Sequence, residues 1–338
     1  MRKLATLLSV LILAACAGGP VSLPEPRVGP DELLARRTSG VDAAVYRDER
    51  FWLNPDMVMR YFVDLSIRDV EKDGIPVALL GSLREEWPVL NYSRSANLSA
   101  SDAFRTQQAN CLSFSEVVIS LMRHAGVRAQ FQRVESLPQW DLDGDSAVAA
   151  LHINAVIFQR GKRAEIDWFP NQASTGQERK FLLNDDEALA EWHNNIGTEA
   201  LLRENYPQAF AELSRALRLS PKAAHIWVNL GVLYRRLGMS TEAESAWLIA
   251  LQQNQRQLQA MSNLQQLYAG RDQQVLADEI KDLILHYRKN NPYYHFLLAQ
   301  QAERAQRLDE ALRHIRRARR MHDDERFNEL QARLTEQL

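Results

Sequence analysis

Three residues of the chain have the types and the order that nucleophilic catalysis on an amide requires. Cys111 follows Asn110, a good N-cap, at the start of an amphipathic run, so we expect the thiol in the first turn of a helix. There the free N–H groups and the helix dipole favour a thiolate. His152 and Asp167 lie on two predicted strands further along the chain. Thiol catalysis uses such a set, in which a base takes the proton from sulfur and a carboxylate orients the base.

The elements that position these residues follow from local patterns. Apolar residues at helical spacing, followed by a glycine, predict a helix that starts at the cysteine: Cys111, Phe114, Val118, Leu121, Met122 and Gly126. The segments 127–136, 147–158 and 164–170 have strand patterns, with a turn at Arg160-Gly161-Lys162 between the last two. His152 and Asp167 flank this turn and are expected to face each other. The first-turn amides of the helix would supply N–H donors to a developing oxyanion.

Each of these residues also has a purely structural interpretation. A lone cysteine is among the most buried residue types and behaves as a small hydrophobe. A histidine on an apolar strand, such as His152, is compatible with a satisfied core position. Asp167, between Ile166 and Trp168, is harder to explain in this way, because a carboxylate among apolar neighbours needs a partner. His124 is expected to belong to the helix end, where the dipole favours it, and not to the site.

The order and spacing resemble the transglutaminase-like superfamily of papain-type folds over about residues 90–170. The resemblance is carried by NCLSFSEVVISLMRHAGVRAQFQRV, by LHINAVIF and by EIDWFP. It implies an α+β domain in which Cys111, His152 and Asp167 are catalytic and a thioester forms on the cysteine. Asn110 stands where the family commonly has glycine. The upstream residue that assists the oxyanion hole in some members has four candidates here, Trp87, Tyr92, Gln107 and Gln108.

The sequence predicts no cofactor, no metal and no nucleic-acid partner. The segment DLDGDS, 141–146, resembles a calcium loop only superficially, because its glycine comes early and His152 stands where the bidentate glutamate belongs. The formal net charge of −2 gives no basic field for nucleic acid. The locally basic segment 304–320 is expected to be a solvated helix face, with a phospholipid or acidic-partner surface as the alternative.

The N-terminus has the pattern of an exported, lipid-anchored protein. Two basic residues precede about twelve apolar or small ones, 4–15, a run too short to span a membrane and typical of a signal peptide. Its end, LAAC, resembles a bacterial lipoprotein signal, which implies removal of residues 1–15 and acylation, with chains such as palmitate, at Cys16. By the same resemblance Ala17 favours the outer membrane, facing the periplasm. An ordinary signal peptide with a chance cysteine is the alternative.

The C-terminal half repeats every 34 residues from about residue 190. Four positions hold similar residues in phase: Ile196, Leu230, Leu264 and Leu298; Gly197, Gly231, Gln265 and Ala299; Ala209, Ala243, Ala277 and Ala311; Ala216, Ala250, Ile284 and Ala318. Small residues let two antiparallel helices approach closely, and large apolar residues fill the seam to the next unit. The third unit departs from the pattern, with Gln265 for glycine and Lys281 in an apolar slot, so we expect looser packing or a shifted register there.

The period and residue types resemble the tetratricopeptide repeat over 190–323. This resemblance implies a groove for a peptide or protein partner. Five polar residues on first-helix positions are candidates to line it: Asn194, Asn195, Asn229, Arg235 and Asn263. Residues 324–338 are expected to form a capping helix.

The predicted organisation has four parts: a signal peptide at 1–15, a lipidated cysteine with a proline- and glycine-rich tether at 16–30, a transglutaminase-like cysteine domain at 31–185, and four repeats with a capping helix at 186–338. The expected fold class is an α+β domain followed by an all-α solenoid. Two functions remain open. One is a cysteine hydrolase or acyltransferase acting on amide bonds, served by the repeats. The other is a non-catalytic scaffold for an envelope complex, with a degenerate cysteine domain.

Overall fold

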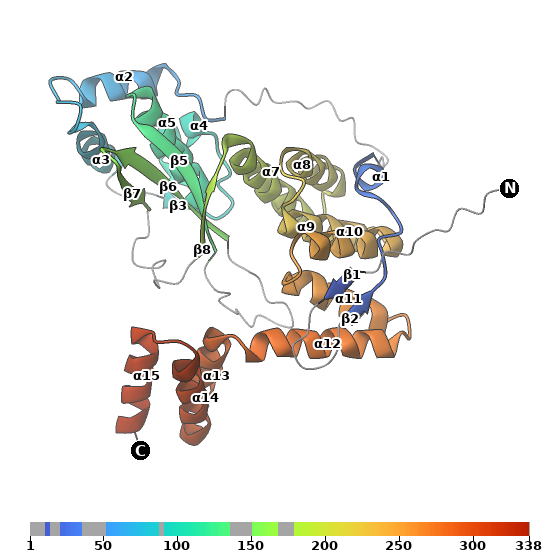
Figure 1. Ribbon diagram of the computed structural model, residues 1–338. Helices are drawn as coiled ribbons and strands as arrows, with labels where there is room; N and C mark the ends of the chain where they lie inside the picture. Colours follow the sequence, from blue (N-terminus) through green and yellow to red (C-terminus); the bar gives the residue numbers. More distant parts are fainter. Residues whose placement is uncertain are drawn as a thin grey trace. The chain divides into compact units, whose positions relative to one another are not determined.

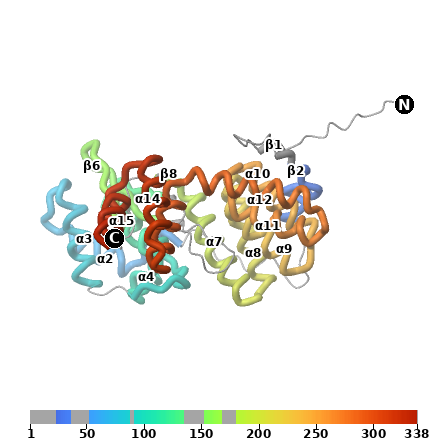
Figure 2. Tube along the Cα trace, turned by 90° about the horizontal axis from the view of Figure 1, so that it is seen from below, coloured from blue at the N-terminus to red at the C-terminus, as the bar shows by residue number. Residues whose placement is uncertain are grey.

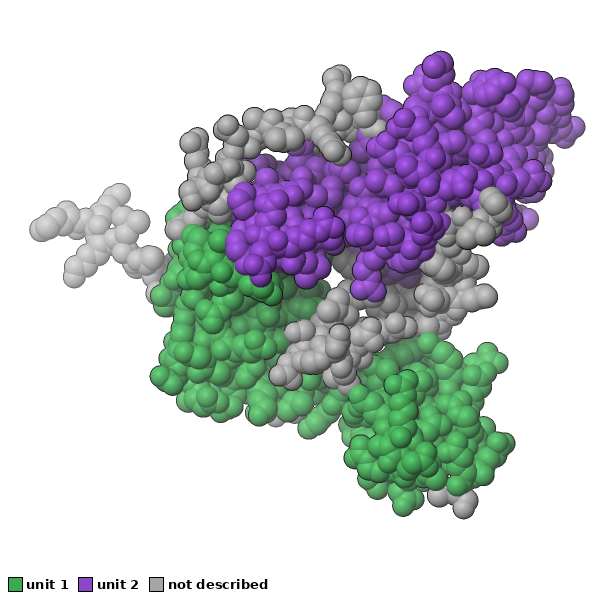
Figure 3. Space-filling view, turned by 180° about the vertical axis from the view of Figure 1, so that it is seen from behind, with its two compact units in different colours: residues 1–36, 137–149, 222–338 green, residues 37–136, 150–221 purple. Residues whose placement is uncertain are grey.

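The structure, a computed structural model, describes residues 11–13, 21–35, 52–87, 91–135, 151–167 and 179–337 (Figures 1 and 2). Its contacts divide the chain into two compact units (Figure 3). Unit 1 comprises residues 1–36, 137–149 and 222–338, and unit 2 comprises residues 37–136 and 150–221. The division at 221/222 differs from the boundary at 185/186 that the sequence suggests.

The described part of unit 2 begins with four helices, the last of which starts at the cysteine. They are α2 (Met57–Ser66), α3 (Ile75–Glu86), α4 (Ala100–Thr106) and α5 (Cys111–His124). The side chains of Asp56, Ser99 and Asn110 cap α2, α4 and α5 by accepting a backbone N–H of the first turn. Every residue of α5 from 112 to 122 is buried. The helix is therefore surrounded by protein. The sequence pattern had suggested an amphipathic helix with one apolar stripe.

A four-stranded antiparallel sheet packs against α5, with strand order β7-β6-β5-β8. Its strands are β5 (Arg128–Glu135), β6 (Leu151–Gln159), β7 (Lys162–Ile166) and β8 (Arg179–Leu183). Arg160 and Gly161 both have positive φ, which gives the tight two-residue turn between β6 and β7. A separate short pair joins β3 (Asn91–Tyr92) in parallel to β4 (Gln108–Ala109), just before the cysteine.

The core of unit 2 explains where the units divide. It contains aromatic contacts such as the stacked pair Trp52 and Phe131, whose ring centroids lie 5.5 Å apart. The first repeat helix, α7 (Asp185–Leu202), adds Leu189 and Trp192 to this same core. Its partner α8 (Tyr206–Leu219) follows it closely. The first helix pair of the repeats is thus packed as part of the cysteine-containing unit.

The C-terminal region is an all-helical solenoid of the tetratricopeptide type, as the 34-residue period predicts. Unit 1 contains α9 (Ala224–Arg236), α10 (Ser240–Gln253), α11 (Leu258–Ala269), α12 (Gln274–Lys289), α13 (Pro292–Arg304), α14 (Leu308–Met321) and α15 (Glu325–Glu336). Gly231 shows why the period needs a small residue: a Cβ there would lie 2.3 Å from the indole Nε1 of Trp247. In the third repeat Lys281 is exposed, whereas Ala277, Ile280 and Ile284 are buried, so this helix keeps its repeat register and loses one apolar contact at position 281.

The N-terminal segment of unit 1 packs on the repeats. It contains β2 (Val21–Leu23), paired antiparallel with β1 (Leu11–Leu13), and the short helix α1 (Pro30–Ala35). Leu23, Val28 and Leu33 are buried. The described part of the expected tether therefore lies against protein, because apolar residues at regular spacing interrupt its prolines and glycines. Cys16 lies outside the described residues.

Candidate functional site

The start of α5 is fixed by hydrogen bonds on both sides of Cys111. Asn110 Oδ1 accepts the backbone N–H of Ser113 at 2.8 Å, and Asn110 Nδ2 donates to Asn97 Oδ1 at 2.7 Å. Ser115 Oγ donates to the carbonyl of Cys111 at 2.8 Å and contacts the carbonyl of Ile153, on β6, at 3.3 Å. Cys111 itself is a free, half-buried thiol. The first turn of the helix is thus held against the strand that carries His152.

The structure brings His152 and Asp167 together. The hairpin of β6 and β7 sets Ala155 opposite Ile166, so that Asp167 directly follows the last paired residue. His152 Nε2 lies 2.5 Å from Asp167 Oδ2, with the two side chains 24% and 11% exposed. This contact uses Nε2, and Cys111 lies near enough to the same ring to raise its pKa. All three predicted site residues therefore meet at one place.

The ring of His152 is positively charged over the physiological range. Burial by itself lowers the pKa of His152, but hydrogen bonds to Asp167 and Cys111, together with their negative charges, outweigh it and raise that pKa to about 10. The imidazolium stands between a carboxylate and a sulfur. A charged imidazole beside the sulfur is the arrangement that cysteine nucleophiles use.

The four candidates for the upstream residue that assists the oxyanion hole lie in different places. Trp87 is buried in the core, where its ring lies 6.4 Å from that of Phe114. Gln107 donates to the carbonyl of Glu86 at 3.1 Å, and Gln108 is exposed on β4. Burial raises the pKa of Tyr92, the charge of Cys111 raises it further, and Arg94 opposes both. This interaction with Cys111 keeps Tyr92 as a candidate.

Glu116 is a group of this region that the sequence reasoning missed. It lies on α5 five residues after Cys111, is completely buried, and neither carboxyl oxygen has a hydrogen-bond partner among the described residues. Burial raises the pKa of Glu116 well above its usual range, and the charge of Cys111 adds to the effect. The surroundings therefore favour the neutral form of this carboxyl. The signal in the sequence was the single charged residue between Cys111 and Met122.

A second missed feature is a polar network across the sheet. Gln132 Nε2 donates to Asn154 Oδ1 at 3.1 Å, both residues being buried. Arg163 donates to Gln132 Oε1 and, at 2.8 Å, to Glu165 Oε1, while Lys180 Nζ donates to Glu165 Oε2 at 2.7 Å. Asn154 follows His152 by two residues and so shares its face of β6. The network ties the strand that carries the base to its neighbours.

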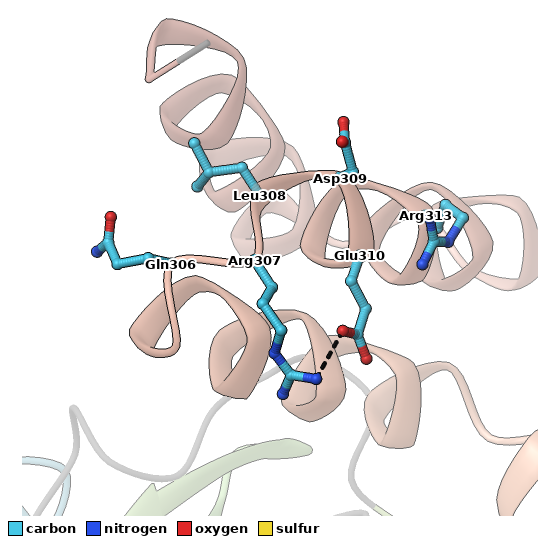
Figure 4. A pocket seen from close by; sticks show the side chains of 6 residues that line it. All are labelled: Gln306, Arg307, Leu308, Asp309, Glu310 and Arg313. Carbon is cyan, nitrogen blue, oxygen red and sulfur yellow. Dashed lines mark ion pairs between the residues drawn. The ribbon is translucent and has the colours of Figure 1, made fainter.

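Other candidate residues lie away from the thiol. His124 is the last residue of α5, about 20 Å along the helix from Cys111, as expected for a residue of the helix end. A surface hollow in unit 1 is lined by residues of the α13–α14 turn, where Arg307 and Glu310 form an ion pair at 2.8 Å (Figure 4). It contains none of the predicted catalytic residues.

The expected groove residues are divided between the units. Asn194 and Asn195 belong to unit 2, whereas Asn229, Arg235 and Asn263 belong to unit 1.

Two further observations concern metal sites and membrane-spanning helices. Within the described ranges, no group of three or more histidine, cysteine, aspartate or glutamate side chains is placed to hold a metal ion. The segment 141–146 lies outside those ranges. In the same part of the chain, no helix has the length and hydropathy needed to cross a membrane.

Comparison with known proteins identifies the repeats. The family model of the tetratricopeptide repeat matches residues 194–257. A protein O-mannosyl-transferase of Caenorhabditis elegans is 33% identical over 75 residues, which are 22% of this chain and 11% of that protein. The chain thus spans about a tenth of the length of that relative. Tetratricopeptide repeats are generally protein-binding modules, and the match supports a protein partner for this chain.

Proposed function

We propose that this protein is a lipid-anchored cell-envelope enzyme with a transglutaminase-like domain that acts on amide bonds. Its repeats would bind a peptide or protein partner. The observation that carries the proposal is the contact between His152 and Asp167, with Cys111 near enough to the same ring to raise its pKa. A carboxylate, an imidazolium and a thiolate in this order are what cysteine acyl transfer needs.

The charges of the three side chains suggest the reaction sequence. The thiolate of Cys111 attacks the amide carbonyl, and N–H donors of the first turn of α5 stabilise the oxyanion. The C–N bond then breaks, the proton of the His152 imidazolium goes to the departing amine, and a thioester remains. Neutral His152 next takes a proton from water, which attacks the thioester. The products are a carboxylic acid and the regenerated thiolate–imidazolium pair, and an amine in place of water would give transamidation.

The envelope location rests on the N-terminal pattern. The sequence LAAC ending at Cys16 supports acylation of that residue, and several acyl chains anchor a protein stably where one would not. Ala17 supports an outer-membrane destination. In such an oxidising compartment Cys111 has no second cysteine with which to pair.

The rate of alkylation of Cys111 tests the catalytic proposal. Iodoacetamide labelling of the chain without residues 1–16 is measured between pH 5 and 9 for wild type, His152→Ala and His124→Ala. We expect fast labelling below pH 7 that collapses in His152→Ala. His124→Ala is the matched control, because it removes a histidine from the far end of the same helix, and it should label like wild type. Slow labelling with an ordinary thiol profile in all three proteins would overturn the catalytic proposal.

A non-catalytic scaffold is the second candidate, and the tetratricopeptide match is the observation that favours it. Slow, ordinary alkylation of Cys111 would favour the scaffold function. Binding partners would then be sought for the repeats alone.

A further inference from the structure

Helix α10 is buried on all sides, unlike the other second helices of the repeats. All its residues from 242 to 251 are buried, including five consecutive apolar ones, Trp247 to Leu251. In α14, by contrast, the buried residues form one stripe. A helix that is apolar all round must be covered all round. Its neighbours in the solenoid cover only part of α10, so another segment must cover the rest.

The N-terminal segment 21–35 is that cover (Figure 1). Ser245 Oγ accepts the backbone N–H groups of Arg27 at 3.2 Å and Val28 at 3.1 Å. Seven residues further along α10, Gln252 Nε2 donates to Glu25 Oε2 at 3.0 Å. Residues 245 and 252 lie on one face of the helix, two turns apart. The segment therefore runs antiparallel to α10 along this face.

Three apolar side chains at five-residue spacing hold the segment down. Leu23, Val28 and Leu33 are between 0% and 5% exposed. The last of them also offers its backbone carbonyl, which accepts the hydroxyl of Tyr234, from α9, at 2.5 Å. At the other end of the segment, β2 contacts α12. The contacts thus come from three helices of two successive repeats, with both side-chain and backbone recognition.

We propose that the face formed by Tyr234, Ser245 and Gln252 is a peptide-binding site whose ligand is the chain's own segment 21–35. Its ligand class is an extended segment with apolar residues five apart that ends in a helical turn. Its consequence for membrane attachment rests on the proposed lipid anchor at Cys16. The seven residues from Cys16 to Leu23 span at most about 25 Å, so the docked segment holds these repeats close to the bilayer. The protein would then be attached to the membrane through its repeats.

Cleavage behind the segment tests this attachment. A protease site is inserted between residues 40 and 41 of the full-length chain, and membranes are cleaved and sedimented at once. We expect most of the 41–338 fragment to stay with the membranes. Leu33→Ser in the segment, and Ser245→Val in its site, should each release most of it. Leu202→Ser changes an exposed leucine and serves as the matched control, which should retain the fragment.

The two proposals fail in different ways. Release of the wild-type 41–338 fragment to the same extent as from Leu33→Ser, with residues 16–40 still on the membrane, would overturn the docking site. If residues 16–40 themselves leave the membrane, the lipid anchor is refuted. The docking site is then tested by hydrogen exchange in the intact chain. Slow exchange of the Arg27 and Val28 amides that becomes fast in Ser245→Val supports the site, and fast exchange in wild type overturns it.

Discussion

Replacing Asp167 with asparagine removes the charge that holds the His152 ring protonated, while it keeps the size of the side chain. The pKa of His152 is about 10 in the folded chain, against 6.5 for an ordinary histidine. This difference corresponds to roughly 5 kcal/mol of preferential stabilisation of the charged ring, shared between Asp167 and Cys111. We expect Asp167→Asn to lose about half of it, or about 2–3 kcal/mol, at pH 6.

The pH dependence of that loss is the sharper part of the prediction. The folded-state pKa of His152 is above its unfolded value, so its contribution to stability is complete below pH 6.5. The contribution disappears as the pH rises through about 10, because the ring is then neutral in both states. The free-energy difference between wild type and Asp167→Asn should therefore shrink steadily between those two values.

Two measurements check this reasoning. Urea unfolding under reducing conditions, monitored through hydrogen exchange in β6, gives the stability of the hairpin region at pH 6 and above pH 10. Titration of the His152 ring by NMR gives its pKa directly in both proteins. A destabilisation by Asp167→Asn that is equal at both pH values, or a wild-type ring that titrates near 6.5, would refute the assignment of His152 as a stably charged group.

Three further predictions concern packing and burial. Gly231→Ala should destabilise α9–α10 by about 1–3 kcal/mol in thermal unfolding, because its Cβ meets an indole ring, whereas Gly81→Ala, where the space is open, should be neutral or stabilising. Glu116→Leu should raise stability against urea by about 1–3 kcal/mol, since it removes a buried carboxyl without partners among the described residues, and an unchanged or lower midpoint would contradict that account. His295 and His314 stack with their Nδ1 atoms 3.2 Å apart, and burial lowers the pKa of each ring. The helix pair α13–α14 should therefore lose stability as the pH falls below 6.5, which hydrogen exchange measures. His314→Gln should make this stability less dependent on pH.

Local patterns predicted the elements around the thiol well. Asn110 as a cap, the turn at Arg160-Gly161 and the strands that it joins are all present, because caps and tight turns depend on a few neighbouring residues. The repeat also followed from its period. Glu116 was missed because the pattern suggested a helix with one apolar stripe, and complete burial of α5 depends on the packing of the whole unit.

Two expectations depended on long-range packing that composition does not reveal. Prolines and glycines in 16–30 suggested a tether, yet Leu23 and Val28 dock on a helix more than two hundred residues away. The five apolar residues from 247 to 251 were the sequence signal of a missing partner. Similarly, Leu189 and Trp192 look like residues of the first repeat but pack in the core of unit 2.

The hairpin of β6 and β7 carries two of the three proposed catalytic groups on one short stretch of chain. His152 and Asp167 are 15 residues apart and are joined through a two-residue turn, so their pairing requires the closure of only a short loop. Hairpins of this kind form in about 1–10 μs, whereas Cys111 reaches the ring only when α5 packs against the sheet. During folding the base and its carboxylate should therefore be assembled before the nucleophile arrives. The thiol therefore meets its base only when α5 packs against the sheet.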